Sequence, residues 1–360
     1  MGGGFTHSAH TTKARMVTQP DQAVSAVRSA VKRLLSAARD AGQLTSGVIG
    51  VGVSGGADSL ALAAGARHVT RRLGLRVRGL VVDHGLQSGS AEVAARAAAQ
   101  LDGIGFDEVR VLPVRVDGPG GPEAAARRAR YTALSRSMPT QGALVLLGHT
   151  LDDQAETVLL GLGRGSGPRS IAGMRPLNPP WGRPLLGLTR VTTEQACAAL
   201  GLDTWRDPHN IDPAFTRVRL RHEVLPLLED VLQGGVAAAL ARTAAQLRED
   251  CEALDEFAKH LLDRAREDQG PPWREGSVDA CALAGVAAAV RRRAVRQWLL
   301  ESGVANVTDA QLRRIDDLVG DWRGQGGVLL RGGLVARREH GRLLLDQAEP
   351  GRPTYQEDWR

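Results

Sequence analysis

The 360-residue sequence has little cysteine, and its three cysteines stand far apart. Cys197, Cys251 and Cys281 form neither a C-x-x-C pair nor the even, closely spaced set of a disulfide framework. This spacing argues against chemistry at cysteine and is typical of a protein in a reducing cytoplasm.

Long apolar runs are also absent from the sequence. No stretch reaches the roughly 20 apolar residues that a helix needs to cross a membrane, and residues 1–22 lack the apolar core of a secretion signal. These first residues are rich in glycine, threonine, serine and histidine, and we interpret them as a disordered tail. We expect a soluble, cytoplasmic protein that has no membrane partner.

The length and the charge of the chain set broad limits on its organisation. Single hydrophobic cores stop growing at about 250 to 300 residues, so a chain of 360 residues is expected to form two or three domains. The formal net charge of +6 permits a polyanionic partner such as a nucleic acid. A generally arginine-biased composition would give the same charge without such a partner.

A glycine-rich turn follows the first apolar run, at residues 48–53, and precedes a helix-like stretch. Its residues are Ser54, Gly55, Gly56, Ala57, Asp58 and Ser59. Glycines let the backbone curl around an anion, and the amides and dipole at the start of the following helix attract negative charge. An ordinary tight turn between a strand and a helix would also use such glycines.

This turn differs from a Walker loop because it carries no lysine. Asp58 would repel phosphate unless a divalent cation such as Mg²⁺ lay between them. We therefore predict that the turn holds the pyrophosphate part of a nucleotide, with Ser54, Gly55, Gly56 and Ser59 as donors. Asp58 is predicted to be a ligand of Mg²⁺ or of the pyrophosphate.

Strand-like and helix-like segments alternate from Ala23 to about Arg190. The apolar strand runs cover residues 48–53, 76–82, 109–114 and 143–147, and the helical stretches cover residues 23–41, 58–73, 90–102, 123–137 and 152–162. This alternation predicts an α/β fold with a doubly wound parallel sheet. Ligands of such sheets collect at the carboxyl ends of the strands, so the residues that follow each run are candidates for the site.

Polar residues follow two of these runs. Asp83 and His84 end the second run and could bind a nucleotide or a metal, although a turn residue beside a surface histidine would look the same. Asp152, Asp153 and Glu156 follow the fourth run. One carboxylate suits the positive end of a helix, but three exceed what capping needs. Asp153 and Glu156 share one helical face, which could hold Mg²⁺ or the ammonium group of an amine substrate.

A third group stands on the helix that Glu123 opens. Arg127, Arg130 and Tyr131 lie within about one helical turn of one another. A triphosphate or a tRNA could use these arginines as charge clamps. A solvated basic face, with a pair between Glu123 and Arg127, is the simpler interpretation.

The turn and these groups, in this order and spacing, resemble the tRNA(Ile)-lysidine synthetase family within the PP-loop ATP pyrophosphatase superfamily. The resemblance continues through Trp205-Arg206-Asp207-Pro208-His209-Asn210-x-Asp212, Phe215, Arg217, Arg219, Arg221 and Leu225-Pro226. It covers about residues 45–230 and implies an adenine nucleotide alpha hydrolase-like sheet. Members of the family commonly have asparagine where this sequence has Val218.

The resemblance implies an ATP-dependent ligase that also uses Mg²⁺. In such an enzyme, the 2-carbonyl oxygen of the wobble cytidine in a tRNA(Ile) with a CAU anticodon would attack the α-phosphorus of ATP and release pyrophosphate. The amine of L-lysine would then attack C2 of the adenylated cytidine and expel AMP, which leaves lysidine. Asp153 and Glu156 would recognise or deprotonate lysine, Arg217 would bind its carboxylate, and Arg127 would act on the phosphates.

Composition and layout divide the chain into four parts. These are a tail at 1–22, the PP-loop catalytic domain at 23–230, a helical tRNA-contacting domain at 231–305 and a small α+β module with a tail at 306–360. Arg291, Arg292 and Arg293 would meet tRNA phosphates, unless they form the exposed face of a packing domain. A homodimer is possible, because the sequence does not give the oligomeric state.

Two other functions fit parts of the same pattern. Another PP-loop enzyme, such as a tRNA thiolase or an amidating synthetase, would share the turn, but thiolases of this kind need cysteines beside the site and none precedes Arg190. A catalytically silent tRNA-binding module would share the fold. The intact Ser54, Asp58, Asp153 and Glu156 disfavour that interpretation.

Overall fold

The computed structural model describes residues 21–85, 89–118, 121–138, 141–165, 167–267, 276–348 and 354–355. Residues 1–20 of the predicted tail lie outside this set. The chain divides into two compact units, Met1–Ala244 and Ala245–Arg360. Each unit has a hydrophobic core of its own.

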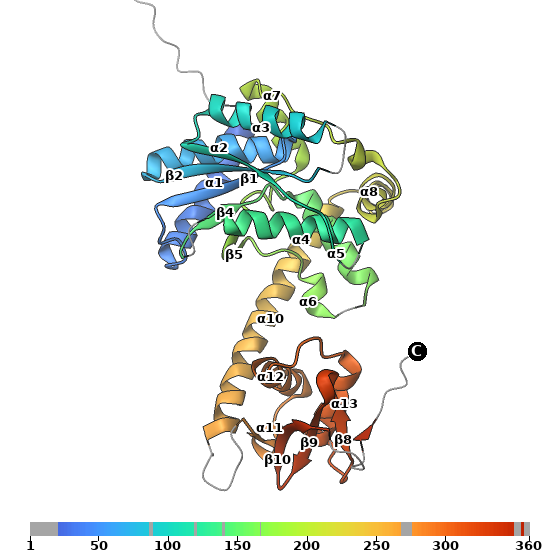
Figure 1. The fold of residues 1–360 in the computed structure, drawn as a ribbon. Helices are drawn as coiled ribbons and strands as arrows, with labels where there is room; N and C mark the ends of the chain where they lie inside the picture. Colours follow the sequence, from blue (N-terminus) through green and yellow to red (C-terminus); the bar gives the residue numbers. More distant parts are fainter. Residues whose placement is uncertain are drawn as a thin grey trace, which may run out of the picture. The chain divides into compact units, whose positions relative to one another are not determined.

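A six-stranded sheet forms the centre of the first unit, in the order β3-β2-β1-β4-β6-β5 (Figure 1). The parallel strands are β1 (Val48–Val53), β2 (Arg76–Asp83), β3 (Glu108–Pro113), β4 (Leu144–Leu146) and β6 (Trp181–Gly182), and β5 (Leu177–Asn178) pairs antiparallel with β6. The predicted α/β fold with a doubly wound parallel sheet is confirmed. The sequence did not indicate β5 and β6, because two-residue strands show no periodicity.

Seven helices precede or follow these strands along the described chain. They are α1 (Gln22–Asp40), α2 (Ala57–Leu73), α3 (Ser90–Ile104), α4 (Gly121–Arg136), α5 (Leu151–Gly163), α6 (Pro168–Ile171) and α7 (Arg190–Leu200). The chain continues through η1 (Pro208–Ile211), α8 (Thr216–Arg219), the π-helical turn η2 (Leu220–Val224), α9 (Leu225–Val231) and α10 (Val236–Glu267). The predicted helices correspond to α1 to α5, with ends that shift by one or two residues.

Helices cover both faces of the sheet. Successive side chains of a strand point to opposite faces, and apolar side chains on both faces must be covered. Val77 and Val81 of β2 belong to the larger core, which α1, α2, α3 and α7 complete. Leu80, between them, belongs to a smaller core with Leu134 of α4. Strands buried on both faces read as the continuous apolar runs from which the sheet was predicted.

The strand order reverses between β1 and β4. From β1 the sheet extends to β2 and β3 on one side and to β4 on the other. In doubly wound sheets, ligands bind in the crevice at the carboxyl ends of the strands where this reversal occurs. The glycine-rich turn after β1 and the acidic residues after β4 therefore come to the same place.

The second unit contains a five-stranded sheet in the order β11-β8-β9-β10-β7. Its strands are β7 (Val278–Asp279), β8 (Gly327–Leu329), β9 (Leu334–Glu339), β10 (Arg342–Gln347) and β11 (Thr354–Tyr355), and its pairs are antiparallel except for β11 with β8. The remaining elements are α11 (Ala280–Ala284), α12 (Ala288–Glu301), α13 (Asp309–Gly320) and the turn η3 (Arg331–Gly333). The core of this unit includes the fully buried side chain of Trp298.

The arginine cluster of α12 is partly built into this core. Arg291 is only 9% exposed, and its Nε donates to Asp316 Oδ1 at 2.6 Å. Arg293 Nη1 lies 3.6 Å from Asp255 Oδ1. The expectation that Arg291 meets tRNA phosphates is wrong, because its guanidinium is buried and paired inside the unit.

The described helices were also compared with the requirements of a membrane span. None of them alone is long and apolar enough to cross a bilayer. Only the bent pair Thr216–Val231 and Val236–Glu267 meets those requirements jointly, by length and composition.

Candidate active site

The glycine-rich turn closes on itself at the start of α2. Gly55 has a φ of +85°, a conformation that residues with a side chain rarely adopt, and Gly56 is the N-cap residue of α2. Ser59 Oγ donates to the Gly56 carbonyl oxygen at 2.9 Å and accepts from the Ser54 amide at 3.2 Å. The Trp205 amide donates to the Gly55 carbonyl oxygen at 2.9 Å. The turn is thus fixed beside a helix N-terminus, which favours the binding of an anion.

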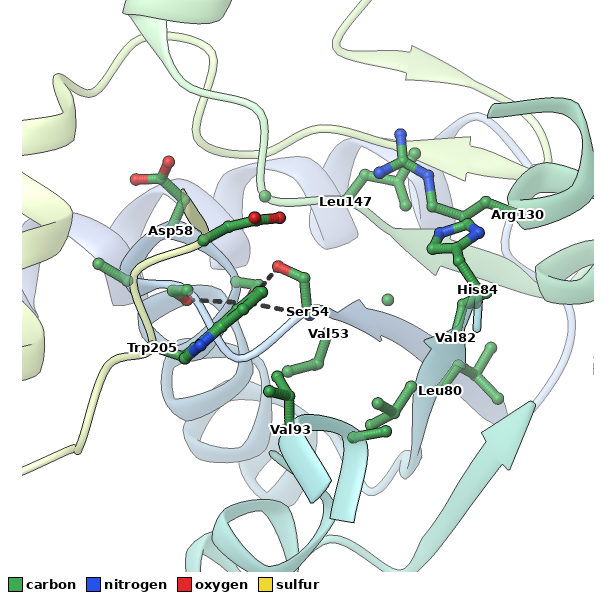
Figure 2. A pocket seen from close by; sticks show the side chains of 18 of the residues that line it. Val53, Ser54, Asp58, Leu80, Val82, His84, Val93, Arg130, Leu147 and Trp205 are labelled. Atoms are coloured by element: carbon green, nitrogen blue, oxygen red, sulfur yellow. Dashed lines mark hydrogen bonds between the residues drawn. The ribbon is translucent and has the colours of Figure 1, made fainter. Parts of the chain in front are cut away.

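A pocket of about 470 Å³ opens beside this turn (Figure 2). Residues at the carboxyl ends of β1, β2 and β4 line it. The pocket brings together nearly all the residues predicted to bind a nucleotide, namely Ser54, Gly56, Asp58, Ser59, Asp83 and His84. Gly55 shapes the turn but is not part of the lining.

One wall of the pocket is apolar. Its side chains include Val53, Leu80, Val82, Val93, Leu134 and Leu147. His84 stands at the edge of this wall, and its buried Nδ1 has no hydrogen-bond partner among the described residues. Burial and the nearby Arg130 lower the pKa of His84, so its ring is neutral at pH 7. The apolar wall can therefore pack against a flat heterocycle, and the ring of His84 can hydrogen-bond to that heterocycle.

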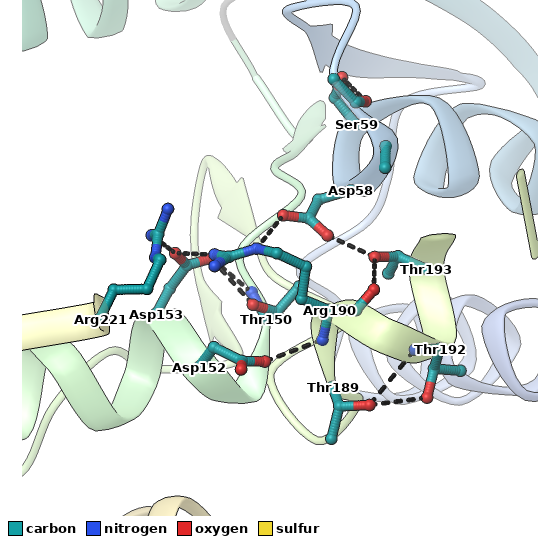
Figure 3. A network of polar contacts seen from close by, with 12 residues as sticks. Asp58, Ser59, Thr150, Asp152, Asp153, Thr189, Arg190, Thr192, Thr193 and Arg221 are labelled. Carbon is teal, nitrogen blue, oxygen red and sulfur yellow. Dashed lines mark hydrogen bonds and ion pairs between the residues drawn. The ribbon is translucent and has the colours of Figure 1, made fainter. Parts of the chain in front are cut away.

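Arg190, the first residue of α7, joins the glycine-rich turn to the acidic start of α5 (Figure 3). Its Nε donates to Asp58 Oδ2 at 3.3 Å, and its Nη2 donates to Asp153 Oδ1 at 3.1 Å. Its backbone amide donates to Asp152 Oδ2 at 2.8 Å. One guanidinium therefore bridges carboxylates that follow two different strands.

Both oxygens of Asp58 are engaged by donors. Thr193 Oγ1 donates to Oδ1, and Arg190 Nε donates to Oδ2. Burial raises the pKa of Asp58 above its ordinary value despite these two donors. The negative charge of this carboxylate consequently depends on its cationic and hydroxyl partners.

The acidic residues of the pocket fit a metal only in combination with a ligand. Among the described residues, no group of three or more His, Cys, Asp or Glu could hold a metal ion. Mg²⁺ is commonly bound through one or two carboxylates together with substrate phosphates and waters. Asp58 fits that arrangement if Arg190 leaves its Oδ2. A magnesium ion at this site would therefore arrive with a nucleotide.

Asp153 lines the pocket and also caps α5. The Thr150 amide donates to its Oδ2 at 2.8 Å, which leaves Oδ1 to Arg190 and Arg221 at 3.1 and 3.4 Å. Burial alone would raise the pKa of Asp153, but Arg190, the Thr150 amide and further positive charges outweigh burial and lower it. The carboxylate is therefore anionic at neutral pH and suits the binding of a cation.

Glu156 lies behind the pocket rather than in its lining. Its side chain is 0% exposed, and Arg221 Nε donates to its Oε1 at 2.7 Å. The buried Oε2 has no hydrogen-bond partner among the described residues, and Arg217 Nη1 lies 3.7 Å from it. Burial raises the pKa of Glu156 despite Arg221. Of the two acids predicted to share a face, only Asp153 reaches the pocket, while Glu156 holds Arg221.

The arginines of α4 occupy different positions. Arg127, which the sequence favoured, is exposed and outside the pocket lining, and its Nη2 donates to Tyr131 Oη at 3.3 Å. Arg130 lines the pocket, and its buried Nε has no hydrogen-bond partner among the described residues. The sequence placed both arginines within one helical turn but did not indicate which of them faces the sheet.

The segment after α7 completes the polar side of the pocket. Trp205, Asp207 and Arg221 line it, whereas Arg217 does not. Arg217 Nη1 lies 3.5 Å from Thr157 Oγ1, next to Glu156. Among the arginines of this segment, Arg221 therefore lines the pocket, and Arg217 lies outside the lining, beside Thr157 and Glu156.

The sequence missed Arg190 and gave little weight to His149, which also lines the pocket. A cation at a helix N-terminus is unfavourable unless acids lie nearby, and the sequence pattern predicted no helix that begins at Arg190. Asp58, Asp152 and Asp153 are those acids. Burial lowers the pKa of His149 to about 3, so its ring is neutral at pH 7.

Two family models match the chain. A PP-loop domain matches residues 25–228, and a TilS substrate binding domain matches residues 279–344. The first match covers the sheet, the glycine-rich turn and the pocket. The second covers most of the described part of the second unit.

Curated relatives match over most of their length. A protein of Rhodococcus jostii named tRNA(Ile)-lysidine synthase is 53% identical over 333 residues, which are 91% of this chain and 97% of the relative. A protein of Nocardia farcinica with the same name is 58% identical over 302 residues, or 82% of this chain and 91% of the relative.

A solved structure shares the fold. The U34-tRNA thiolase NcsA from Methanococcus maripaludis, determined with its 4Fe-4S cluster, aligns with a TM-score of 0.51 and 18% identity. The alignment covers 63% of this chain and 80% of that chain. At this identity the likeness concerns the fold alone.

Proposed function

The chain belongs to the tRNA(Ile)-lysidine synthase family, and from this premise we propose how its residues carry out the reaction. The enzyme is an ATP-dependent ligase that joins lysine to C2 of the wobble cytidine in tRNA(Ile) with a CAU anticodon. Its products are lysidine in the tRNA, AMP and pyrophosphate. The observation that carries the residue assignments is the single pocket that holds both the PP-loop turn and Asp153.

ATP lies with its phosphates on the turn and its base on the apolar wall. The donors to the β- and γ-phosphates are Ser54, Gly55, Gly56 and Ser59, at the positive end of α2. Asp58 would hold a Mg²⁺ ion, which would supply positive charge to the phosphates of the nucleotide. Asp83 and the neutral ring of His84 contact the nucleoside end, where His84 Nδ1 has no partner within the described part of the chain.

Arg130, rather than Arg127, faces the reacting phosphate in this proposal. It lines the pocket together with the neutral His149, and its buried Nε has no partner among the described residues. Arg127 supports this part of α4 by its contact with Tyr131. The cytosine 2-carbonyl oxygen forms a bond to the α-phosphorus while the bond to the pyrophosphate oxygen breaks, and positive charge at Arg130 stabilises the added negative charge.

Lysine binds at the start of α5. Asp153 receives the side-chain ammonium, because it is the carboxylate of this helix that lines the pocket and stays charged. Arg221 and Arg217 provide positive charge for the lysine carboxylate, and the buried Glu156 positions Arg221. A carboxylate with a lowered pKa is a weak base, so we assign Asp153 to recognition and not to deprotonation.

The second step completes the ligation. The side-chain ammonium of lysine first loses one proton to solvent. The free amine forms a bond to C2 of the adenylated cytidine while the bond from C2 to the oxygen of AMP breaks, and the new nitrogen releases a second proton to solvent. Since a wobble base lies in a single-stranded loop, it enters the pocket without the breaking of a duplex.

The remaining parts of the chain serve tRNA binding in this proposal. Residues 231–305 and 306–360 contact the tRNA, and residues 23–230 form the catalytic domain. Arg331 is an exposed arginine of the second unit that suits a phosphate contact. We also propose a cytoplasmic location, and mass photometry would decide whether the enzyme is a homodimer.

A reconstituted reaction tests the function. The full chain is incubated with ATP, Mg²⁺, labelled L-lysine and tRNA(Ile) with a CAU anticodon, and the digested tRNA is analysed for the modified nucleoside. We expect label in lysidine at the wobble cytidine and pyrophosphate release that depends on this tRNA. Tight tRNA binding without turnover would favour a silent tRNA-binding module instead.

Sulfur transfer, the chemistry of the thiolase with the shared fold, has no support in the described pocket. No cysteine is among its lining residues. Cys197 lies close by, but its Sγ donates to the Ala57 carbonyl oxygen at 3.3 Å. Burial raises the pKa of Cys197 to about 11, so it stays a protonated thiol and a poor nucleophile.

A further inference from the structure

We propose that Arg190 is an internal cation that occupies the lysine-binding carboxylate Asp153 until nucleotide and its metal draw it away. The inference rests on the roles proposed above for Asp58 and Asp153. It adds an order to the reaction, because lysine gains full access to Asp153 only after ATP is in place. Arg190 is therefore a positioning residue that acts through two carboxylates.

The contacts of the Arg190 guanidinium favour exchange. Charge-assisted N–H···O bonds of arginine are commonly about 2.7 to 2.9 Å long, whereas those to Asp58 and Asp153 measure 3.3 and 3.1 Å. The side chain is 22% exposed, so incoming ligands can reach it. At these distances, each of the two carboxylates holds the guanidinium more weakly than a single bidentate carboxylate would.

The backbone of Arg190, in contrast, is fixed. Its amide donates to Asp152 Oδ2 at 2.8 Å, and its carbonyl oxygen lies 2.7 Å from the Thr193 hydroxyl that contacts Asp58. Thr189 caps α7 by accepting from the Thr192 amide. The guanidinium can consequently move between acceptors while α7 keeps its place.

Competition at Asp153 follows from the occupancy of its oxygens. Oδ2 is committed to the Thr150 amide, so a cationic ligand must use Oδ1, where Arg190 Nη2 already donates. The ammonium of lysine and the guanidinium of Arg190 are thus alternative donors to one oxygen. Arg221 also approaches this oxygen, at 3.4 Å, but Glu156 holds it at 2.7 Å.

Nucleotide binding changes this balance at Asp58. A Mg²⁺ ion that binds Asp58 displaces Arg190 Nε from Oδ2, and the triphosphate beside the turn offers the guanidinium new acceptors. Arg190 then leaves Asp153 Oδ1 as well. Because coupling between two ligands is reciprocal, ATP strengthens lysine binding and lysine strengthens ATP binding by the same factor.

Calorimetric titration of L-lysine into the full chain tests this coupling. In the wild type, we expect Mg²⁺ with a non-hydrolysable ATP analogue to lower the lysine Kd by about tenfold, a typical coupling. Arg190→Gln removes the competitor, so lysine binds about tenfold more tightly without the analogue, and the analogue then changes the Kd less than about twofold. Arg190→Lys keeps a competing cation and retains the weaker binding.

Controls separate this mechanism from a structural effect. Arg72→Gln, an exposed arginine in the last turn of α2, should leave the lysine Kd and the coupling at wild-type values. Asp152→Asn loosens the backbone anchor of α7 and should not tighten lysine binding. A purely structural role for Arg190 would weaken lysine binding in Arg190→Gln, which is opposite to the expected change.

Several results would overturn the inference. An unchanged wild-type Kd in the presence of the analogue would do so, and this measurement does not depend on any variant folding. Unchanged or weaker lysine binding by a folded Arg190→Gln would do so as well. If Asp153→Asn leaves lysine binding unaltered, the proposed lysine site itself is wrong, whereas loss of binding in Asp153→Asn without tightening in Arg190→Gln rejects only the role of Arg190.

Discussion

At the residue scale, the chemistry of the site depends on a few charged groups whose donors and acceptors are shared. Asp58 and Asp153 both accept hydrogen bonds from Arg190, and their pKa values nevertheless move in opposite directions. Burial dominates at Asp58, while the positive charges and the Thr150 amide dominate at Asp153. The same residue type thus takes two roles according to its surroundings.

Asp153→Asn tests the assignment of the lysine site. We expect the lysine KM to rise about 10- to 100-fold, because a hydrogen bond to a charged group contributes about 1.5 to 3 kcal/mol. Adenylation of tRNA in a single turnover without lysine should stay close to wild type. Steady-state kinetics with labelled lysine measure the first quantity. Wild-type lysine KM and rate in both Asp153→Asn and Glu156→Gln would reject the assignment of this acidic pair.

His149 gives a prediction for stability against pH. Its pKa is about 3 in the folded chain, compared with 6.5 for an ordinary histidine, so between these values the unfolded chain binds more protons. Stability from this group is therefore complete above pH 6.5 and decreases as the pH falls, by up to about 1.4 kcal/mol per pH unit.

Urea unfolding at pH 7.5, 6.0 and 5.0 measures this dependence. His149→Gln lacks the titrating group. As the pH decreases, the free energy of unfolding should therefore fall more steeply in the wild type than in the variant. A constant difference between wild type and His149→Gln across this range would contradict the neutral, buried state of His149.

At the element scale, short helices and turns bring distant segments to the site. The start of α7 docks on Asp152 and on the turn of α2, and α5 packs closely against α6. The close approach of α5 and α6 depends on Gly161, where an added Cβ would meet backbone atoms of Ser170 and Ile171. A side chain at this position would therefore push α6 away.

Gly161→Ala and Gly163→Ala form a matched pair within α5. An alanine at 161 has no space because its neighbours are backbone atoms, whereas an added Cβ at 163 meets nothing within 4 Å. We expect Gly161→Ala to lower the free energy of unfolding by about 1 to 3 kcal/mol, as overpacking does. Gly163→Ala should be neutral or stabilising by up to about 1 kcal/mol. Equal effects in chemical unfolding would contradict the close contact of α5 with α6.

At the scale of the whole molecule, the chain combines a catalytic unit with a unit in which some arginines are structural. The Arg291–Asp316 pair is buried in the second unit, and Arg337 is paired with Asp346 there at 2.7 Å. A high arginine content in this part of the chain therefore does not translate directly into a tRNA-binding surface. Arginines that remain exposed, such as Arg331, are better candidates.

Asp316→Asn tests this division. Loss of one partner from a buried ion pair costs about 3 to 5 kcal/mol, so the second unit should unfold at a lower temperature in calorimetry. ATP binding should persist, since these contacts of Arg291 and Asp316 lie within the second unit. Asp309→Asn removes an exposed pair with Arg313 and should cost at most about 1 kcal/mol. Equal losses of stability in the two variants would show that the buried pair stabilises the second unit no more than the exposed pair does.

The amino-acid sequence by itself determined the longer parallel strands of the sheet and the glycine-rich turn. Apolar runs of the length of β1, β2 and β3 separated by helical stretches predict a parallel sheet, and adjacent glycines before a helix predict the anion-binding turn. These features depend on residues that are neighbours in the chain. The acidic residues after β4 were likewise predicted, because the carboxyl ends of parallel strands share one edge of the sheet.

Only the tertiary structure decided which members of each group line the pocket. Periodicity placed Arg127 beside Arg130 and Asp153 beside Glu156, but the packing of α4 and α5 turned one of each pair into the pocket. Arg190 was invisible to local patterns, because its acceptors lie 132 and 37 residues away in the chain. Electrostatic contacts of this kind depend on distance in space and not on distance along the chain. The glycine-rich turn and the start of α5 come close enough for them only once the sheet has formed.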